Sequence, residues 1–151
     1  MNLVFRMLGI LMASFFKPRL PAERLKNDLS MRVLPNDIDI NMHMNNGRYL
    51  TICDLTRVDM FIRTGLARLM IQERWTPAIA EHTMKYKKGL KLFQKYDVFM
   101  EVTHWDNRAF FMNHRFVVGG RVVAEGTSLG VIVSKDGLVS PEKVMDKLNT
   151  R

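Results

Sequence analysis

The residues best suited to catalysis lie together in one short polar stretch, residues 36–46. The stretch holds two acids, one histidine and four asparagines: Asn36, Asp37, Asp39, Asn41, His43, Asn45 and Asn46. Ordering so many polar groups costs free energy unless each finds a partner, whereas a plain turn needs only one or two of them. This density indicates a functional site. The alternative is that these ordinary loop-forming residues only cap turns.

A carboxylate in this stretch, at Asp37 or Asp39, could act as a general base on water or as a nucleophile. If the chain is extended here, the two carboxylates point the same way, and their repulsion raises the pKa of one of them. A predicted helix begins directly afterwards. The free amides near Asn46 and Gly47, together with the helix dipole, can polarise a carbonyl or hold an oxyanion. These features predict an acyl-transfer site.

The sequence shows no Ser-His-Asp or Cys-His arrangement. Cys53 falls inside the predicted helix, where a free cysteine is usually a small core residue. A single cysteine also suits a reducing compartment, and we expect a cytoplasmic location. One Cys and four His without metal-ligand spacing argue against a zinc site. We therefore expect neither a metal nor a cofactor.

A long helix is predicted directly after the polar stretch, from about residue 46 to residue 63. Asn45 or Asn46 can cap its first turn, and Gly65 is placed to end it. Apolar residues cover most of its surface, which is typical of a buried helix. We expect it to be the central helix of the domain. Residues 65–75 continue in a form that is only weakly helical by pattern.

Alternating apolar and polar residues predict strands on both sides of this helix. The expected strands cover residues 29–34, 79–92, 96–105, 109–118 and 121–134. Gly119-Gly120 predicts a two-residue hairpin, and Ser140 with Pro141 begins a short closing helix. This order indicates an α+β fold in which one antiparallel sheet wraps around one helix.

The N-terminal residues 1–20 form a separate apolar segment before a single domain at residues 21–151. The run from residue 3 to 16 is almost wholly apolar, yet shorter than the roughly 20 residues that cross a bilayer. Two interpretations fit. The helix lies in a membrane interface with Arg6, Lys17 and Arg19 at the headgroups, or it packs on the domain or across a subunit boundary.

The formal net charge of +8 is large for 151 residues and favours an anionic partner. Such a partner is a phosphate-bearing ligand, an acidic carrier protein or an anionic lipid surface. We do not expect nucleic acid, because the basic residues are scattered and no nucleic-acid motif is present. The apolar fraction of 47% argues against disorder and for a domain with a real core.

Residues 37–50 read Asp-Ile-Asp-Ile-Asn-Met-His-Met-Asn-Asn-Gly-Arg-Tyr-Leu. This stretch resembles the signature of hotdog-fold thioesterases of the 4-hydroxybenzoyl-CoA and plant acyl-carrier-protein types. The closest likeness is to the thioesterase-superfamily-member-six type and its bacterial relatives. The resemblance extends over nearly the whole chain, including residues 105–110 and 123–126. It implies a hotdog fold that assembles as a homodimer or homotetramer, with the acyl thioester between subunits.

Carried over by motif position, the resemblance implies that Asp39 is the general base or nucleophile, assisted by Asn41 and His43. The candidate substrate-binding residues are Asn45, Asn46, Gly47, Tyr49, Lys87 and Lys88. Two departures affect this comparison. Met42 stands where many members have Gly, and Gly89 follows Tyr86-Lys87-Lys88 where the plant enzymes have Glu.

The sequence therefore predicts a thioesterase that hydrolyses an acyl-CoA or acyl-carrier-protein thioester. A second hypothesis is a non-catalytic acyl-binding or lipid-binding hotdog protein at the membrane surface, favoured by the N-terminal apolar helix and Met42. A third is a hotdog dehydratase acting on acyl thioesters, although the Asp-x-Asn-x-His arrangement resembles the hydrolase pattern better.

Overall fold

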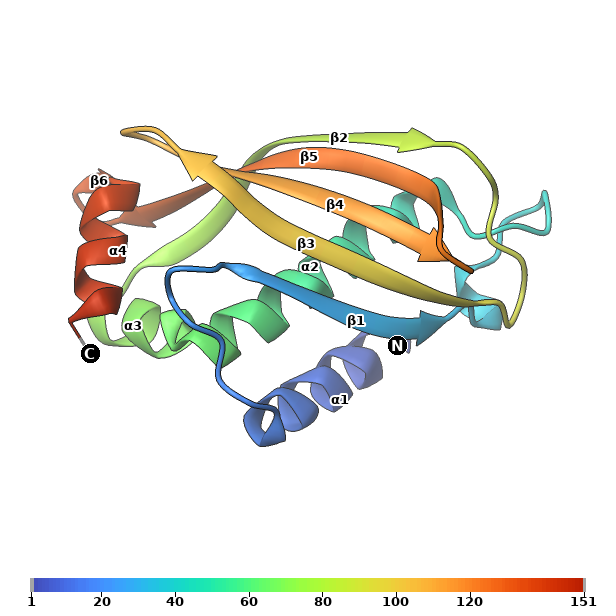
Figure 1. Ribbon diagram of the computed structural model, residues 1–151, viewed down its shortest axis with the longest axis horizontal. Helices are drawn as coiled ribbons and strands as arrows, with labels where there is room; N and C mark the ends of the chain where they lie inside the picture. The colour runs from blue at the N-terminus through green and yellow to red at the C-terminus, as the bar shows by residue number, and fades with distance from the viewer. Residues whose placement is uncertain (1, 151) are drawn as a thin grey trace.

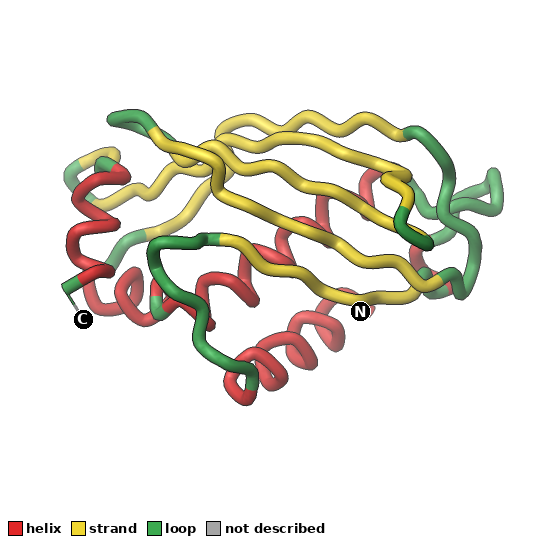
Figure 2. The backbone as a smooth tube through the Cα atoms, viewed as in Figure 1, coloured by secondary structure: helices red, strands yellow, loops and turns green. Residues whose placement is uncertain are grey.

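A computed structural model describes residues 2–150 of the chain. In chain order the elements are α1 (Asn2–Phe16), β1 (Lys26–Arg32), a 3-10 turn (Pro35–Asp37), α2 (Asn46–Thr64), α3 (Leu66–Glu73), β2 (Thr76–Tyr86), β3 (Lys95–Trp105), β4 (Phe110–Val118), β5 (Arg121–Ser134), β6 (Gly137–Val139) and α4 (Pro141–Asn149). The strands form one antiparallel sheet in the order β1-β3-β4-β5-β2, with β6 on β5. The sheet curls over α2 (Figures 1 and 2), as the element order predicted.

The local signals for helix and hairpin ends are confirmed. Asn45 caps α2, and Gly65 ends it in the left-handed region at φ +83°. Gly119 and Gly120, at φ +54° and +78°, turn β4 into β5. Ser140 accepts the amide of Lys143 and caps α4.

The first strand begins at Lys26, three residues before the predicted start. Its early residues pair with β3, where Lys26 lies opposite Glu101. Asn27 interrupts the apolar alternation, but its buried side-chain amide donates to the backbone oxygen of Thr56 and the carboxylate of Asp59 on α2. The period-two pattern missed these residues because a polar side chain occupies an inward position.

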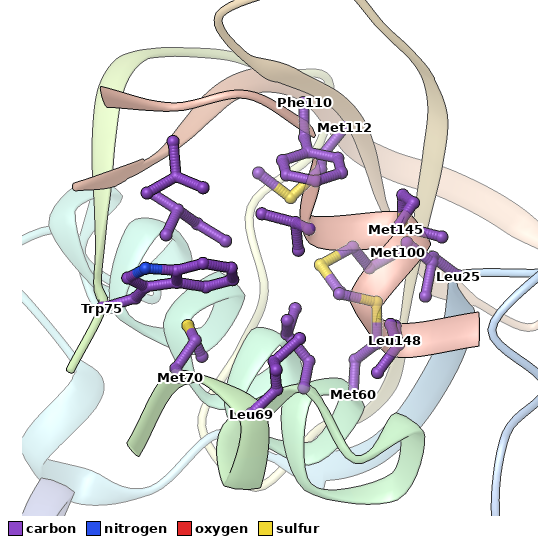
Figure 3. Packing of buried hydrophobic residues seen from close by; sticks show 14 residues of the cluster. Leu25, Met60, Leu69, Met70, Trp75, Met100, Phe110, Met112, Met145 and Leu148 are labelled. Carbon is purple, nitrogen blue, oxygen red and sulfur yellow. The ribbon is translucent and has the colours of Figure 1, made fainter. Parts of the chain in front are cut away.

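The core divides into two clusters along α2. Around the N-terminal half of the helix, Tyr49, Ile52 and Cys53 pack against Tyr96 and Phe116 of the sheet. The other cluster lies where α2, α3 and α4 meet the sheet, and Figure 3 shows Trp75 and several methionines within it. The central position of α2 predicted from its apolar surface is confirmed.

The N-terminal helix α1 packs against α2 (Figure 1), and large apolar side chains on its other face are exposed. Its inner face includes Ser14, whose hydroxyl donates to Asp59 of α2 at 2.6 Å. Lys17 lies 3.3 Å from the same carboxylate. Asp59 is fully buried in the middle of a helix that the sequence pattern suggested was mostly apolar inside. No helix within residues 2–150 combines the length and apolarity needed to cross a bilayer.

Gly126 on β5 permits the close approach of the neighbouring strand β2. A Cβ atom there would lie 2.0 Å from the backbone oxygen of Thr83 and 3.0 Å from Cα of Met84. We expect Gly126→Ala to lower the free energy of unfolding by about 2–3 kcal/mol, because β2 must shift away from β5. Urea unfolding measures this loss. Gly9→Ala, where a Cβ meets nothing within 4 Å on α1, is the matched control and should not destabilise.

Candidate active site

The polar stretch does not run extended, so the condition under which its two carboxylates would point the same way is not met. Residues 35–45, here called the motif loop, begin with the 3-10 turn Pro35–Asp37. Asp37 is 1% exposed, and its carboxylate pairs with Arg6 of α1 at 2.6 Å and accepts the amide of Leu34. Asp37 is therefore a structural residue held beneath the loop.

Asp39 is the carboxylate that remains near the surface. Its side chain accepts the amide of Asn41 at 2.8 Å, and its backbone oxygen accepts the amide of Met42. The Asp39 amide donates to the backbone oxygen of His43, which closes a tight hairpin. Asp39 is only partly buried and Asn41 is exposed, so the loop presents these two predicted site residues to solvent. Figure 1 places this loop at the end of the molecule away from α4.

The two departures from the family pattern both have a structural counterpart. Met42 has φ +61°, in the left-handed region that favours glycine, so the backbone keeps the shape that a glycine would adopt. Gly89 lies against the predicted site residue His43, and a Cβ at Gly89 would come within 2.6 Å of the imidazole ring. The missing side chain at Gly89 therefore makes room for His43.

The N-terminus of α2 begins at the end of the motif loop. The side chain of Asn45 accepts the amide of Gly47 at 2.8 Å, so the Gly47 amide is engaged. Within residues 2–150 the amide of Asn46 has no acceptor, which leaves it as the candidate donor to a substrate carbonyl. Tyr86 of β2 donates its hydroxyl to the backbone oxygen of Asn46 at 3.1 Å and fixes this end of the helix.

The remaining predicted substrate-binding residues are Tyr49 in the core and the neighbours Lys87 and Lys88 after β2. Tyr49 is 1% exposed in the core, where its ring meets those of Tyr86 and Phe116 edge to face. Burial raises the pKa of its phenol. Lys87 and Lys88 follow β2, and both of their amides donate to the backbone oxygen of Val123. The ammonium group of Lys87 lies 2.9 Å from the exposed carboxylate of Glu125.

A second polar cluster, which sequence reasoning missed, lies between α2 and the sheet. Arg57 is buried and pairs with Asp54 of the same helix. Its other terminal nitrogen lies 3.4 Å from both Nε2 of His114 on β4 and the hydroxyl of Ser128 on β5. His114 and Ser128 are 2.8 Å apart, and His82 of β2 stacks on His114. The sequence signal that could have revealed this cluster is the pair Asp54 and Arg57, two opposite charges three residues apart within an otherwise apolar helix.

Burial is the main reason that the pKa of His114 falls from 6.5 to about 3, and the charge of Arg57 contributes to the same shift. His114 is thus neutral in the folded protein and ionises only on unfolding as the pH falls below 6.5. The unfolded state then binds more protons, and the stability falls with pH by at most about 1.4 kcal/mol per unit from this residue. We expect this loss between pH 6.5 and 4 to be smaller in His114→Gln. Urea unfolding at pH 7, 6 and 5 measures it.

The control for His114→Gln is His104→Gln, which removes an exposed histidine from β3. This control should keep the wild-type pH dependence. Burial also lowers the pKa of His82, so part of the slope should remain in His114→Gln. If the free energy of unfolding fell equally with pH in wild type and His114→Gln, His114 would not be the source of this pH dependence.

Within the part of the chain that the structure describes, no three His, Cys, Asp or Glu side chains are grouped so that they could hold a metal ion. Cys53 is buried in α2, and burial raises the pKa of its thiol to about 12. A thiol of this kind is a poor nucleophile near neutral pH. The carboxylate of Asp39 and the amide of Asn46 are therefore the groups near the loop surface best suited to acyl chemistry.

Comparisons of the sequence and of the fold with known proteins point to one family. A family model described as the thioesterase-like superfamily matches residues 33–148. Protein THEM6 from Xenopus laevis is 31% identical over 121 residues, which cover 79% of this chain and 56% of that protein. The chain thus spans little more than half the length of this curated relative.

Solved structures share the fold at low sequence identity. The probable thioesterase YbaW from Escherichia coli superposes with a TM-score of 0.75 at 16% identity, over 81% of this chain and 95% of that one. A mutant 4-hydroxybenzoyl CoA thioesterase complexed with 4-hydroxybenzoyl CoA gives a TM-score of 0.72 at 13% identity, over 82% and 98%. The curled sheet around one helix is the hotdog fold, as predicted.

Proposed function

Because this chain belongs to the thioesterase-like superfamily, we propose that it hydrolyses an acyl thioester of coenzyme A or of an acyl carrier protein. The observation that carries the proposal is the arrangement of the motif loop. The Asp39 carboxylate lies near the surface of this loop. The loop ends at the N-terminus of α2, where the Asn46 amide has no acceptor within residues 2–150.

In the proposed reaction, the carboxylate of Asp39 accepts a proton from water as the water oxygen adds to the thioester carbon. The negative charge that develops on the carbonyl oxygen is stabilised by the Asn46 amide and the positive end of the α2 dipole. The carbon–sulfur bond then breaks, and the leaving thiolate takes the proton that Asp39 accepted, which returns the carboxylate to its starting state. Asn41 and His43 lie on the same hairpin and assist in holding the substrate. Direct attack by the carboxylate, followed by hydrolysis of the anhydride, is the alternative route.

A phosphate-bearing carrier suits the charge of the chain. The formal net charge is +8, and Lys87 and Lys88 follow β2 near the end of the sheet that carries the motif loop. A related structure is titled as a complex with 4-hydroxybenzoyl CoA, which supports a CoA thioester as the first substrate to test.

A homodimer or homotetramer remains part of the proposal. Within residues 2–150, β2 pairs only with β5, so its outer edge offers unpaired backbone groups over 11 residues. Beside the site, Ile40 and Met42 are 97% and 65% exposed on the motif loop. A second copy that pairs along β2 and covers these side chains would place the substrate between subunits.

The test of the proposed function is thiol release from a panel of acyl-CoAs of increasing chain length and one aromatic acyl-CoA. We expect hydrolysis with a maximum at one class of acyl group, because an apolar site discriminates by size. Absence of turnover with every CoA ester and with acyl carrier protein esters would overturn the hydrolase proposal. Hydration of an enoyl thioester, measured by the loss of its conjugated absorbance because no thiol is released, would instead identify a dehydratase.

A second candidate function is lipid binding at a membrane surface, and it rests on α1. The outer face of this helix exposes six large apolar side chains: Val4, Phe5, Leu8, Met12, Phe15 and Phe16. Of the three cations predicted to lie at the headgroups, Arg6 and Lys17 instead pair with Asp37 and Asp59 inside the fold. Arg19, which is exposed beyond the C-terminal end of the helix, is the one placed to meet an anionic headgroup. The expected cytoplasmic location stays a prediction.

Sedimentation with anionic vesicles tests this surface. We expect the double variant Phe5→Ser, Phe16→Ser to bind the vesicles several-fold more weakly than wild type, because both side chains are exposed on α1. Ile71→Ser removes a 78% exposed side chain from α3 and is the control. Equal partitioning of all three proteins would exclude a membrane role for α1.

A further inference from the structure

We propose that Arg6 of α1 is a positioning residue for the reaction, and that it acts through Asp37 on the motif loop. This inference rests on the proposed hydrolase function, and it gives α1 a role in the site in addition to covering α2. The evidence comes from the contacts of one buried carboxylate.

Both terminal nitrogens of the Arg6 guanidinium group donate hydrogen bonds to the Asp37 carboxylate. Nη1 and Nη2 donate to the two carboxylate oxygens at 3.2 and 2.6 Å, and Nη2 also donates to the backbone oxygen of Arg32 at 3.1 Å. The side chains are only 10% and 1% exposed. A two-point charged contact away from water fixes orientation as well as distance. Arg6 therefore ties α1 both to the end of β1 and to the start of the motif loop.

Asp37 in turn touches both parts of the proposed site. Its backbone oxygen accepts the amide of Asn45, the capping residue of α2, at 2.7 Å. Asp39 follows two residues later on the hairpin. Asp37 is thus linked to Asp39 through the chain and to the start of α2 through the Asn45 amide. A shift of the Asp37 carboxylate would therefore move Asp39 relative to the Asn46 amide. Displacements of about 1 Å between reacting groups can lower a rate on the order of 100-fold.

Arg48 is the other cation near Asp37, but it holds the carboxylate less directly. Its Nε lies 3.6 Å from the carboxylate, and its terminal nitrogen donates to the backbone oxygen of Asn36. Without Arg6, Asp37 would keep a charge partner on one side only. The protein would then remain folded, with the motif loop held less firmly.

A second polar anchor holds the same helix and supplies a matched control. The Ser14 hydroxyl donates to the carboxylate of Asp59 on α2 at 2.6 Å, and the Lys17 ammonium group lies 3.3 Å from the same carboxylate. Ser14 is eight residues beyond Arg6, or about 12 Å along the helix. No contact of Asp59 reaches the motif loop among the described residues. Loss of this anchor should loosen α1 without altering the site directly.

The experiment compares wild type with Arg6→Met, Arg6→Lys and Ser14→Ala. We expect Arg6→Met to lower kcat on the order of 10- to 100-fold with KM within about threefold. We also expect faster hydrogen exchange at the amides of Asp39 and Asn45, which are both hydrogen-bonded inside the loop. Arg6→Lys should recover part of both effects. Ser14→Ala should keep the wild-type kcat and the wild-type exchange at these two amides.

The exchange measurement needs no substrate, so the two proposals can fail separately. Wild-type kcat and exchange in Arg6→Met would overturn the positioning role of Arg6. An equal loss of kcat in Ser14→Ala would also overturn it, because any loosening of α1 would then suffice. If wild type releases no thiol while exchange still rises only in the Arg6 variants, the hydrolase function fails and the coupling of α1 to the motif loop stands.

Discussion

Replacing Asp39 with Asn should lower kcat for thioester hydrolysis by roughly 10²- to 10⁴-fold, the usual contribution of a general base. Asn has nearly the same shape and can still accept the amide of Asn41, so the hairpin should persist. The amide cannot take a proton from water. The affinity for a non-hydrolysable thioether analogue of the preferred acyl-CoA should therefore change little. Steady-state thiol release and calorimetric binding measure the two quantities.

Asp136→Asn is the matched control for this variant, since it removes an exposed carboxylate from the turn between β5 and β6. It should keep the wild-type kcat. If Asp39→Asn retains the wild-type kcat, Asp39 is not the base. In that case Asp54, whose carboxylate is 56% exposed on α2, becomes the next candidate.

Replacing Asp59 with Ala should lower the free energy of unfolding by about 3–5 kcal/mol, as expected when one partner of a buried ionic network is removed. Asp59 is fully buried and accepts hydrogen bonds from Ser14, Lys17, Asn27 and Arg63. The change leaves these donors facing an apolar methyl group and weakens the contact between α1 and α2. Urea unfolding with a constant m-value would measure the loss.

Glu73→Ala provides the contrast, because its 2.9 Å pair with Lys147 is shorter than the 3.3 Å pair of Lys17 with Asp59. The side chains of Lys147 and Glu73 are 40% and 31% exposed, so water screens their pair and its loss should cost less than about 1 kcal/mol. Similar losses for the two variants would show that burial does not control the strength of these pairs.

Asp59 should also contribute to the acid sensitivity of the protein. Burial raises the pKa of Asp59, but hydrogen bonds from Ser14, Asn27 and Arg63 and the charge of Lys17 outweigh it and leave the pKa below its usual value of 3.8. Its stabilising contribution is therefore present above the unfolded pKa and lost as the pH falls through the lower folded value. This window lies below the one that His114 controls.

Much of the architecture could be predicted from local signals in the sequence. Asn45, Gly65 and Ser140 mark helix ends through their own hydrogen bonds or backbone freedom. Gly119-Gly120 sets a hairpin in the same way. Each signal acts within a few residues, so it does not depend on the rest of the chain. The α+β order and the place of the motif before the central helix followed from these signals.

The roles of individual polar residues were decided only by the tertiary structure. Asp37 and Asp39 are alike in sequence, but Arg6, 31 residues away, reaches Asp37 and makes it structural. Ser14 reaches Asp59 across 45 residues, and Arg57 reaches Ser128 across 71. A buried charge is tolerated only where a partner from elsewhere in the chain pairs with it. The hydrophobic pattern of one helix does not show which distant residue that partner is. The sequence by itself thus determined where the candidate site lies, directly before the central helix, and packing of distant elements determined which of its carboxylates lies near the solvent.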